Sequence, residues 1–308
     1  MGKGCIDDRR HRWKSTSLIW ILTTFLIYLV LRVLLSSSKS LIDSLSTSIS
    51  DRRTALYDML SSDLVKNGPV FLRGKTSQYI FDVRDGVVTP LLKGSYPPVR
   101  ANILYISSKY SIPISHVIKD IFLPDFDQVI WFQNTTLYHF SMFHASHNVT
   151  SVFATDIEIE AEVNTVKSVA DGLCPLKAVL DRVVLTSSGV LLGCWQVSSG
   201  SDPLLIRTKL KEALPRAPDK QVYDPVILHS TFARIFGHPN IQLKEQDEVN
   251  YLQDLVSHVN NKLRGFQATI NELWYVEEFD VLALALDGKM KIRKCHLGCS
   301  SKLLNVTL

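Results

Sequence analysis

One short pattern, found twice at positions ninety residues apart, constrains the fold of this chain more than any other feature. Between residues 224 and 237 the residues alternate as in a strand, and a period of two places His229 and Thr231 on one face. A second short apolar strand, residues 138–143, carries His139 and Ser141 in the same relation. The chain therefore presents an imidazole beside a hydroxyl group on two separate strands.

The segments after the two strands also repeat. Thr155 and Glu158 form a capping-box pattern that opens an amphipathic helix, and a second amphipathic helix begins near Gln246. Each predicted helix is followed by strands: 178–186 and 190–197 around a Ser-Ser-Gly turn, and 268–293 around Asp287-Gly288. The order of strand, helix and hairpin thus occurs twice, which indicates an internal duplication.

Two such His-x-[Ser/Thr] strands resemble the motifs of the 2H (two-histidine) phosphoesterase superfamily, which includes RNA ligase/cyclic nucleotide phosphodiesterase-like proteins. The similarity covers about residues 127–293, and the second motif, residues 229–234, is the closer match because it includes Arg234. The resemblance implies an α+β fold: a two-lobed, duplicated antiparallel-sheet domain with outer helices. It also implies a substrate that is a phosphodiester small molecule or an oligonucleotide end.

The paired motifs predict metal-independent hydrolysis of a (cyclic) phosphodiester, with no cofactor. His139 and His229 would act as general base and general acid, in an order that the sequence does not assign. Ser141 and Thr231 would donate hydrogen bonds to the phosphate oxygens. Unless the strand bends, its period places Arg234 on the opposite face from Thr231, where it would support the fold.

The first motif has a competing register at His144-Ala145-Ser146. We favour His139 because apolar residues flank it and because it keeps the ninety-residue offset from His229. By strand period, His144 would lie on the opposite strand face from His139.

The N-terminus predicts a membrane anchor. Residues 15–31 carry no charge and the apolar run continues to residue 35, which is long enough to cross a bilayer. The basic tail, residues 1–14, predicts a cytosolic N-terminus and a lumenal domain in the secretory pathway, ER or Golgi. A cleaved signal peptide is the alternative. Residues 1–35 hold the whole net charge of +4, so the neutral remainder does not favour binding of duplex nucleic acid.

The rest of the chain is expected to divide into three parts. Residues 36–68 are Ser-rich and suggest a stem, residues 69–126 an N-terminal extension, and residues 127–300 the phosphoesterase-like domain. Lumenal glycosylation would use Asn134, Asn148 or Asn305. Three pairings are open to the four cysteines after the anchor, Cys174, Cys194, Cys295 and Cys299. Two of these thiols with His296 are too few for a zinc site, so we expect no metal.

Two other classes of function fit the same layout. A type II membrane glycosyltransferase would have this anchor and stem, and Asp125-Phe126-Asp127 would hold its metal and sugar nucleotide. A 2H-like domain that binds a ligand without catalysis is the second alternative. The oligomeric state does not follow from the sequence.

Overall fold

The computed structural model describes residues 48–71, 81–84 and 87–298. The described residues from Arg52 onward belong to one compact unit. Within the described ranges, no helix combines the length and the apolar character that a membrane crossing requires. The tail and the span expected at residues 1–14 and 15–35 lie outside the described residues and remain predictions.

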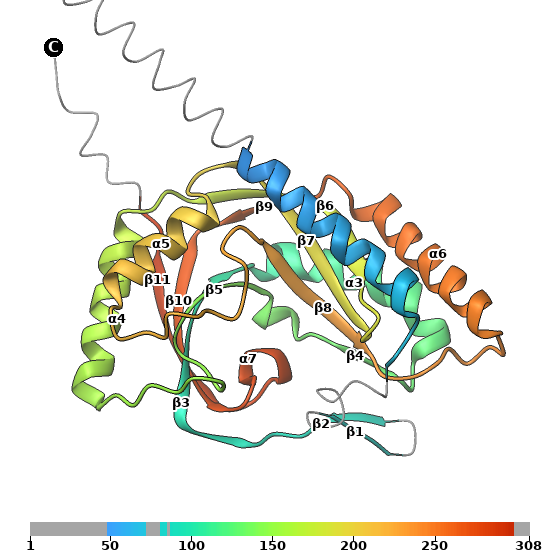
Figure 1. The fold of residues 1–308 in the computed structure, drawn as a ribbon, viewed down its shortest axis with the longest axis horizontal. Coiled ribbons are helices and arrows are strands. Elements are labelled where there is room, and N and C mark those ends of the chain that lie inside the picture. The colour runs from blue at the N-terminus through green and yellow to red at the C-terminus, as the bar shows by residue number, and fades with distance from the viewer. Residues whose placement is uncertain (1–47, 72–80, 85–86, 299–308) are drawn as a thin grey trace, which may run out of the picture. The chain divides into compact units, whose positions relative to one another are not determined.

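Two antiparallel sheets form the centre of the unit (Figure 1). The first has the order β11-β10-β3-β5, from strands β3 (Gly94–Tyr105), β5 (His139–Ser146), β10 (Glu272–Asp280) and β11 (Met290–His296). The second has the order β4-β8-β7-β6-β9, from β4 (Ile130–Phe132), β6 (Leu176–Leu185), β7 (Val190–Ser199), β8 (His229–Ile235) and β9 (Gln267–Ile270). A hairpin of β1 (Phe81–Arg84) and β2 (Val87–Pro90) forms a third, two-stranded sheet.

Helices pack against these sheets, so the expected mixed fold with antiparallel sheets is confirmed. α4 (Asp156–Asp171) contacts β10 and β11, α5 (Pro203–Ala213) contacts β5, and α6 (Glu245–Leu263) contacts β6. The remaining helical elements are α3 (Ser108–Phe126), the 3-10 turn η1 (Thr135–Leu137), the short α7 (Ala283–Leu286) and a helix over residues 48–67. The core joins both sheets and includes Ile114, Phe122, Phe140, Trp195, Phe232 and Leu252.

Local signals place several of these elements where the sequence predicts them. Thr155 and Glu158 form both hydrogen bonds of the capping box at the start of α4. Asp202 accepts a hydrogen bond from the Leu204 amide at the start of α5, with proline in the first turn. Gly189 closes the β6–β7 turn with φ +84, and a β-carbon there would lie 2.1 Å from the Ile235 carbonyl oxygen. Only glycine fits this turn against the end of β8.

The repeated order is present in the fold as β5, α4, β6–β7 and then β8, α6, β10–β11. Each hairpin belongs to the sheet of the other histidine strand. The β6–β7 hairpin pairs with β8, and the β10–β11 hairpin joins the sheet of β5 through β3. The two copies therefore exchange their hairpins, and β5 contacts β8 where the two sheets meet.

The expected boundaries at residues 68 and 127 do not separate parts of this fold. β3, from the expected extension, lies between β10 and β5 in the middle of a sheet. The helix through residues 52–67, expected to be stem, buries Tyr57 completely. The Tyr57 hydroxyl lies 2.7 Å from the carbonyl oxygens of Trp195 and Leu228. This helix therefore holds the residue that precedes His229.

Candidate active site

The two histidine strands line one small cavity. β5 contributes His139 and Ser141, β8 contributes His229 and Thr231, and the cavity has a volume of ≈ 80 Å³. Pockets for whole drug-sized ligands measure about 300–1,000 Å³, so this cavity accommodates one small group such as a phosphate. The other side chains in its wall are Ala101, Gln133, His144, Tyr223, Arg234, Glu278, Leu282, Leu284 and Ala285.

A β-bulge occurs at the same place in both strands. In β5 the register against β3 shifts at Met142, and in β8 the register against β7 shifts at Phe232. One extra residue reverses the alternation of side chains beyond it. His144 and Arg234 therefore return to the cavity wall. The expectation that His144 lies on the opposite strand face is therefore wrong, and for Arg234 the bulge is the bend under which strand period no longer holds.

His139 is held by the backbone two residues before it. Its Nδ1 lies 2.7 Å from the Leu137 carbonyl oxygen. A carbonyl only accepts, so Nδ1 carries the proton and Nε2 is the nitrogen left to exchange one. Burial lowers the pKa of His139, and the bond to the Leu137 carbonyl acts in the opposite direction. The neutral imidazole with a free Nε2 is the form that accepts a proton.

His229 is enclosed in the same way. Its Nδ1 is buried and has no hydrogen-bond partner among the described residues, which leaves Nε2 for proton exchange. Burial lowers its pKa to about 4, helped by the charges of Arg207 and His139. Burial likewise lowers the pKa of His144 to about 4, with His147, His139 and Arg207 acting in the same direction. These lowered pKa values favour the neutral form of all three rings at pH 7.

Tyr223 connects the hydroxyl group of one repeat to the imidazole of the other. Its side chain interacts with the Ser141 hydroxyl, and its ring lies edge-on to the His229 ring with centroids 4.9 Å apart. The cavity wall thus offers hydroxyl donors from Ser141, Thr231 and Tyr223. Hydroxyl groups of this kind donate hydrogen bonds to an anion.

Arg207 on α5 fixes the two strands to each other, and the sequence reasoning did not single it out. The side chain is 7% exposed. Its guanidinium donates to the β5 carbonyls of Ser141 (2.8 Å) and Met142 (3.0 Å). It also donates to Pro225 and Ile227, both at 2.8 Å, in the segment that leads into β8. A signal was available, because Arg207 shares the buried helical stripe of Pro203, Ile206 and Leu210.

α7 forms one end of the cavity, and residues from both sheets form hydrogen bonds to it. From the β8 side, the Gln133 side chain donates to the Leu284 carbonyl at 2.7 Å. From β10, a Glu278 oxygen accepts from the Leu284 amide at 2.9 Å. The sequence reasoning missed Gln133 and Glu278, since neither lies in a motif.

The residues named for the glycosyltransferase alternative lie at the end of α3 and make local hydrogen bonds. Asp125 accepts from the Tyr251 hydroxyl at 2.5 Å, and Asp127 accepts from the Asn240 amide at 2.8 Å. Neither lines the cavity between the histidine strands. Both carboxylates therefore connect α3 to neighbouring segments.

The glycosylation candidates have different surroundings. The Asn134 amide oxygen caps η1 by accepting from Thr136, and its nitrogen donates to Asp287 at 3.0 Å. Asn148 is exposed, and Asn305 lies outside the described residues. Among the described cysteines, Cys174 is disulfide-bonded, whereas Cys194 and Cys295 are free thiols.

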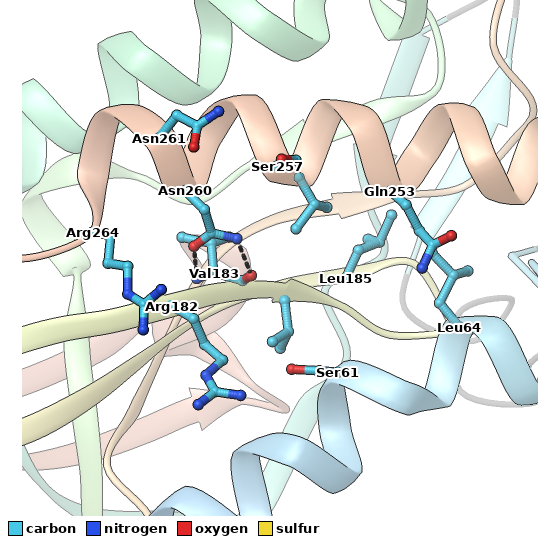
Figure 2. Close-up of a pocket in the computed structure, with 12 residues that line it drawn as sticks. Ser61, Leu64, Arg182, Val183, Leu185, Gln253, Ser257, Asn260, Asn261 and Arg264 are labelled. Carbon is cyan, nitrogen blue, oxygen red and sulfur yellow. Dashed lines mark hydrogen bonds between the residues drawn. The ribbon is translucent and has the colours of Figure 1, made fainter.

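A second cavity, of ≈ 500 Å³, lies between α6, β6 and the helix that carries Ser61 (Figure 2). The Asn260 side chain crosses from α6 and forms two hydrogen bonds to the Val183 backbone, as a neighbouring strand would. As far as the described residues go, no histidine or carboxylate lines this cavity. It lacks the acid–base groups that converge between β5 and β8.

No protein-family model and no curated protein matches the chain. Among solved structures, TT0787 of Thermus thermophilus has a TM-score of 0.44 and 11% identity, covering 65% of this chain and 97% of that one. E. coli LigT complexed with 3′-AMP has a TM-score of 0.39 and 12% identity over 65% and 98% of the two chains. Usb1 of Kluyveromyces marxianus has a TM-score of 0.37 and 14% identity, also over 65% and 98%. At these scores the similarities carry no argument about function, which rests on the residues of the cavity.

Proposed function

We propose that this chain hydrolyses a phosphodiester, with His139 and His229 as its general acid and base. The observation that supports this most is the convergence of both histidines, Ser141 and Thr231 on one phosphate-sized cavity. Two enclosed imidazoles with free Nε2 atoms can move both protons of the reaction. The surrounding hydroxyl groups can take the charge that grows on the phosphate oxygens.

The reaction forms a bond between a water oxygen and phosphorus and breaks the bond from phosphorus to the leaving oxygen. One imidazole takes the proton of the water, and the other gives a proton to the leaving oxygen. One ring must therefore start neutral and the other protonated. Burial lowers the pKa of both rings, but an anionic phosphate between them favours the protonated form. Binding of the anionic phosphate thus raises the pKa of the two rings, and one of them takes up a proton from solvent as the substrate binds.

The substrate is a small cyclic phosphodiester or an oligonucleotide end. The ≈ 80 Å³ cavity accommodates the phosphate and leaves the rest of the molecule outside it. The sequence before residue 36 supports a lumenal position for the domain on a single-pass anchor.

Turnover of 2′,3′-cyclic nucleotides and of bis(p-nitrophenyl) phosphate by the purified full-length protein tests this proposal. His139→Ala and His229→Ala should each lower kcat by roughly 10²-fold or more. His258→Ala, an exposed histidine on α6, and Asp125→Ala should retain wild-type activity. Folded His139 and His229 variants that keep full activity would contradict the proposal. Loss of activity in Asp125→Ala alone, with a requirement for manganese, would favour the transferase alternative.

A further inference from the structure

Glu278 is a carboxylate in the wall of the candidate active site that the proposed reaction does not use. It lies on β10, is 5% exposed, and lines the same cavity as His139 and His229. Its carboxylate accepts hydrogen bonds from the backbone amides of Leu284 and Ala283 in α7. These bonds hold it at the end of the cavity that α7 closes.

The titratable and charged groups that line the cavity together with Glu278 come from three other elements. β5 contributes His139 and His144, β8 contributes His229 and Arg234, and Tyr223 comes from the segment before β8. None of the ion pairs found among the described residues includes Glu278. Burial raises the pKa of Glu278 to about 7, against the effect of the Leu284 and Ala283 amides. The carboxyl group therefore changes charge near neutral pH.

A carboxylate in a cavity that binds phosphate groups repels the substrate and the product of the reaction to different extents. A phosphodiester carries one negative charge, whereas the phosphomonoester product loses a second proton with a pKa of about 6. Repulsion between like charges grows with the product of the charges, and it is strong where water is excluded. The dianionic product is repelled about twice as strongly as the diester at the same place.

We propose that Glu278 selects the charge of the bound anion, admitting the singly charged phosphodiester and expelling the doubly charged product. This inference rests on the proposed function. It makes Glu278 a specificity residue that prevents product from occupying the cavity. It also gives the α7 end of the cavity a role beyond closing the site.

Two anions whose charge is constant from pH 6 to pH 8 separate this effect from titration of the ligand. Sulfate represents the dianion and dimethyl phosphate the singly charged diester. Their dissociation constants are measured by calorimetry on the full-length protein and on Glu278→Gln, whose amide oxygen still accepts from Leu284. Glu272→Gln is the control, since it removes a carboxylate from the same strand outside the cavity wall. Sulfate binding is also measured on His229→Ala, and its loss in this variant shows that the anion binds in the cavity that His229 lines.

At pH 8 we expect Glu278→Gln to bind sulfate about tenfold more tightly than wild type and dimethyl phosphate about threefold more tightly, as the twofold ratio of charges requires. At pH 6 both gains should shrink, because wild-type Glu278 is then protonated. Sulfate affinity within twofold of wild type at pH 8, equal gains for both anions, or the same gains in Glu272→Gln would overturn the proposal. So would absence of sulfate binding in Glu278→Gln.

The charge selection can also be tested if Glu278→Gln does not fold, and its failure can be told apart from failure of the proposed function. If Glu278→Gln does not fold, the wild-type preference for dimethyl phosphate over sulfate must rise between pH 6 and pH 8, and a constant preference refutes the inference. If the protein shows the expected binding without diester turnover, the proposed function fails while the charge selection stands. Turnover without the expected binding refutes the charge selection and leaves the proposed function in place.

Discussion

Replacement of Arg207 by methionine tests whether one buried arginine holds the candidate active site together. The guanidinium donates four hydrogen bonds, at 2.8–3.0 Å, to carbonyls of β5 and of the segment before β8. Methionine fills a similar length without a donor, so all four carbonyls lose this partner. The histidines at the start of each strand then lose their common support.

The expected loss of stability follows from these four bonds. A buried acceptor without a partner costs about 1–3 kcal/mol, and the lower figure suits carbonyls with a second lone pair. Four such groups give about 4 kcal/mol, and removal of a buried charge returns part of this. We therefore expect Arg207→Met to lower the free energy of unfolding by about 2–4 kcal/mol in urea titrations. The matched variant Arg216→Met, which removes an exposed ion pair with Glu158, should cost less than about 1 kcal/mol.

The same variant should change the chemistry of the site in a way that lost stability alone does not. The charge of Arg207 contributes to the lowered pKa of His229, so the pKa of His229 should rise in Arg207→Met. Displacement of the histidines by about 1 Å should lower kcat about 10²-fold. The pKa is measured from the imidazole proton resonances during a pH titration. A stability loss below 1 kcal/mol together with an unchanged pKa of His229 would refute the reasoning.

Three further outcomes are expected. Ser141→Ala and Thr231→Ala should each lower kcat/KM about tenfold, less than loss of either histidine, since each removes one hydrogen bond to the phosphate; equal or larger losses would place these hydroxyl groups in proton transfer. Activity should survive EDTA and give a bell-shaped pH profile of kcat/KM, falling in acid as the base is protonated and in alkali as the acid is deprotonated. Because burial lowers the pKa of free His229 to about 4, one limb should fall below the ordinary histidine value of about 6.5, and two limbs above 6.5 would contradict the assignment. In intact microsomes a C-terminal tag should resist protease, and digestion without detergent would reverse the proposed topology.

Local patterns were enough to predict much of this fold. The capping box of α4, the proline at the start of α5 and the glycine of the β6–β7 turn are each specified by residues within a few positions. The ninety-residue repeat predicted the order of strand, helix and hairpin, and it selected the pair His139 and His229, which the fold brings to one cavity. A repeat is informative because two copies of one pattern limit the register more than either copy alone.

Groups that act over long separations in the sequence could not be predicted in this way. Arg207 reaches the Met142 carbonyl across 65 positions, and Tyr57 reaches Leu228 across 171. Glu278 lies on a strand with no motif, and in the cavity wall its carboxylate accepts a hydrogen bond from the Leu284 amide of α7. Apart from the helical stripe that Arg207 shares with Ile206 and Leu210, nothing local distinguishes these side chains from surface residues, because their partners are backbone carbonyls and amides supplied by other elements.

The register of the two histidine strands shows why counting along a strand failed at the site itself. From His139 to Ser141, and from His229 to Thr231, the period of two holds and both residues face the cavity. One step later each strand has a bulge, and the residues after it, His144 and Arg234, return to the same face. Bulges are common beside active sites because they redirect side chains without ending the strand. Since both strands bulge at the matching position, the repeated unit is better described as His-x-[Ser/Thr]-x-x-[His/Arg]. This six-residue unit places three polar groups from each strand around one anion-sized cavity, where an unbroken strand would place two.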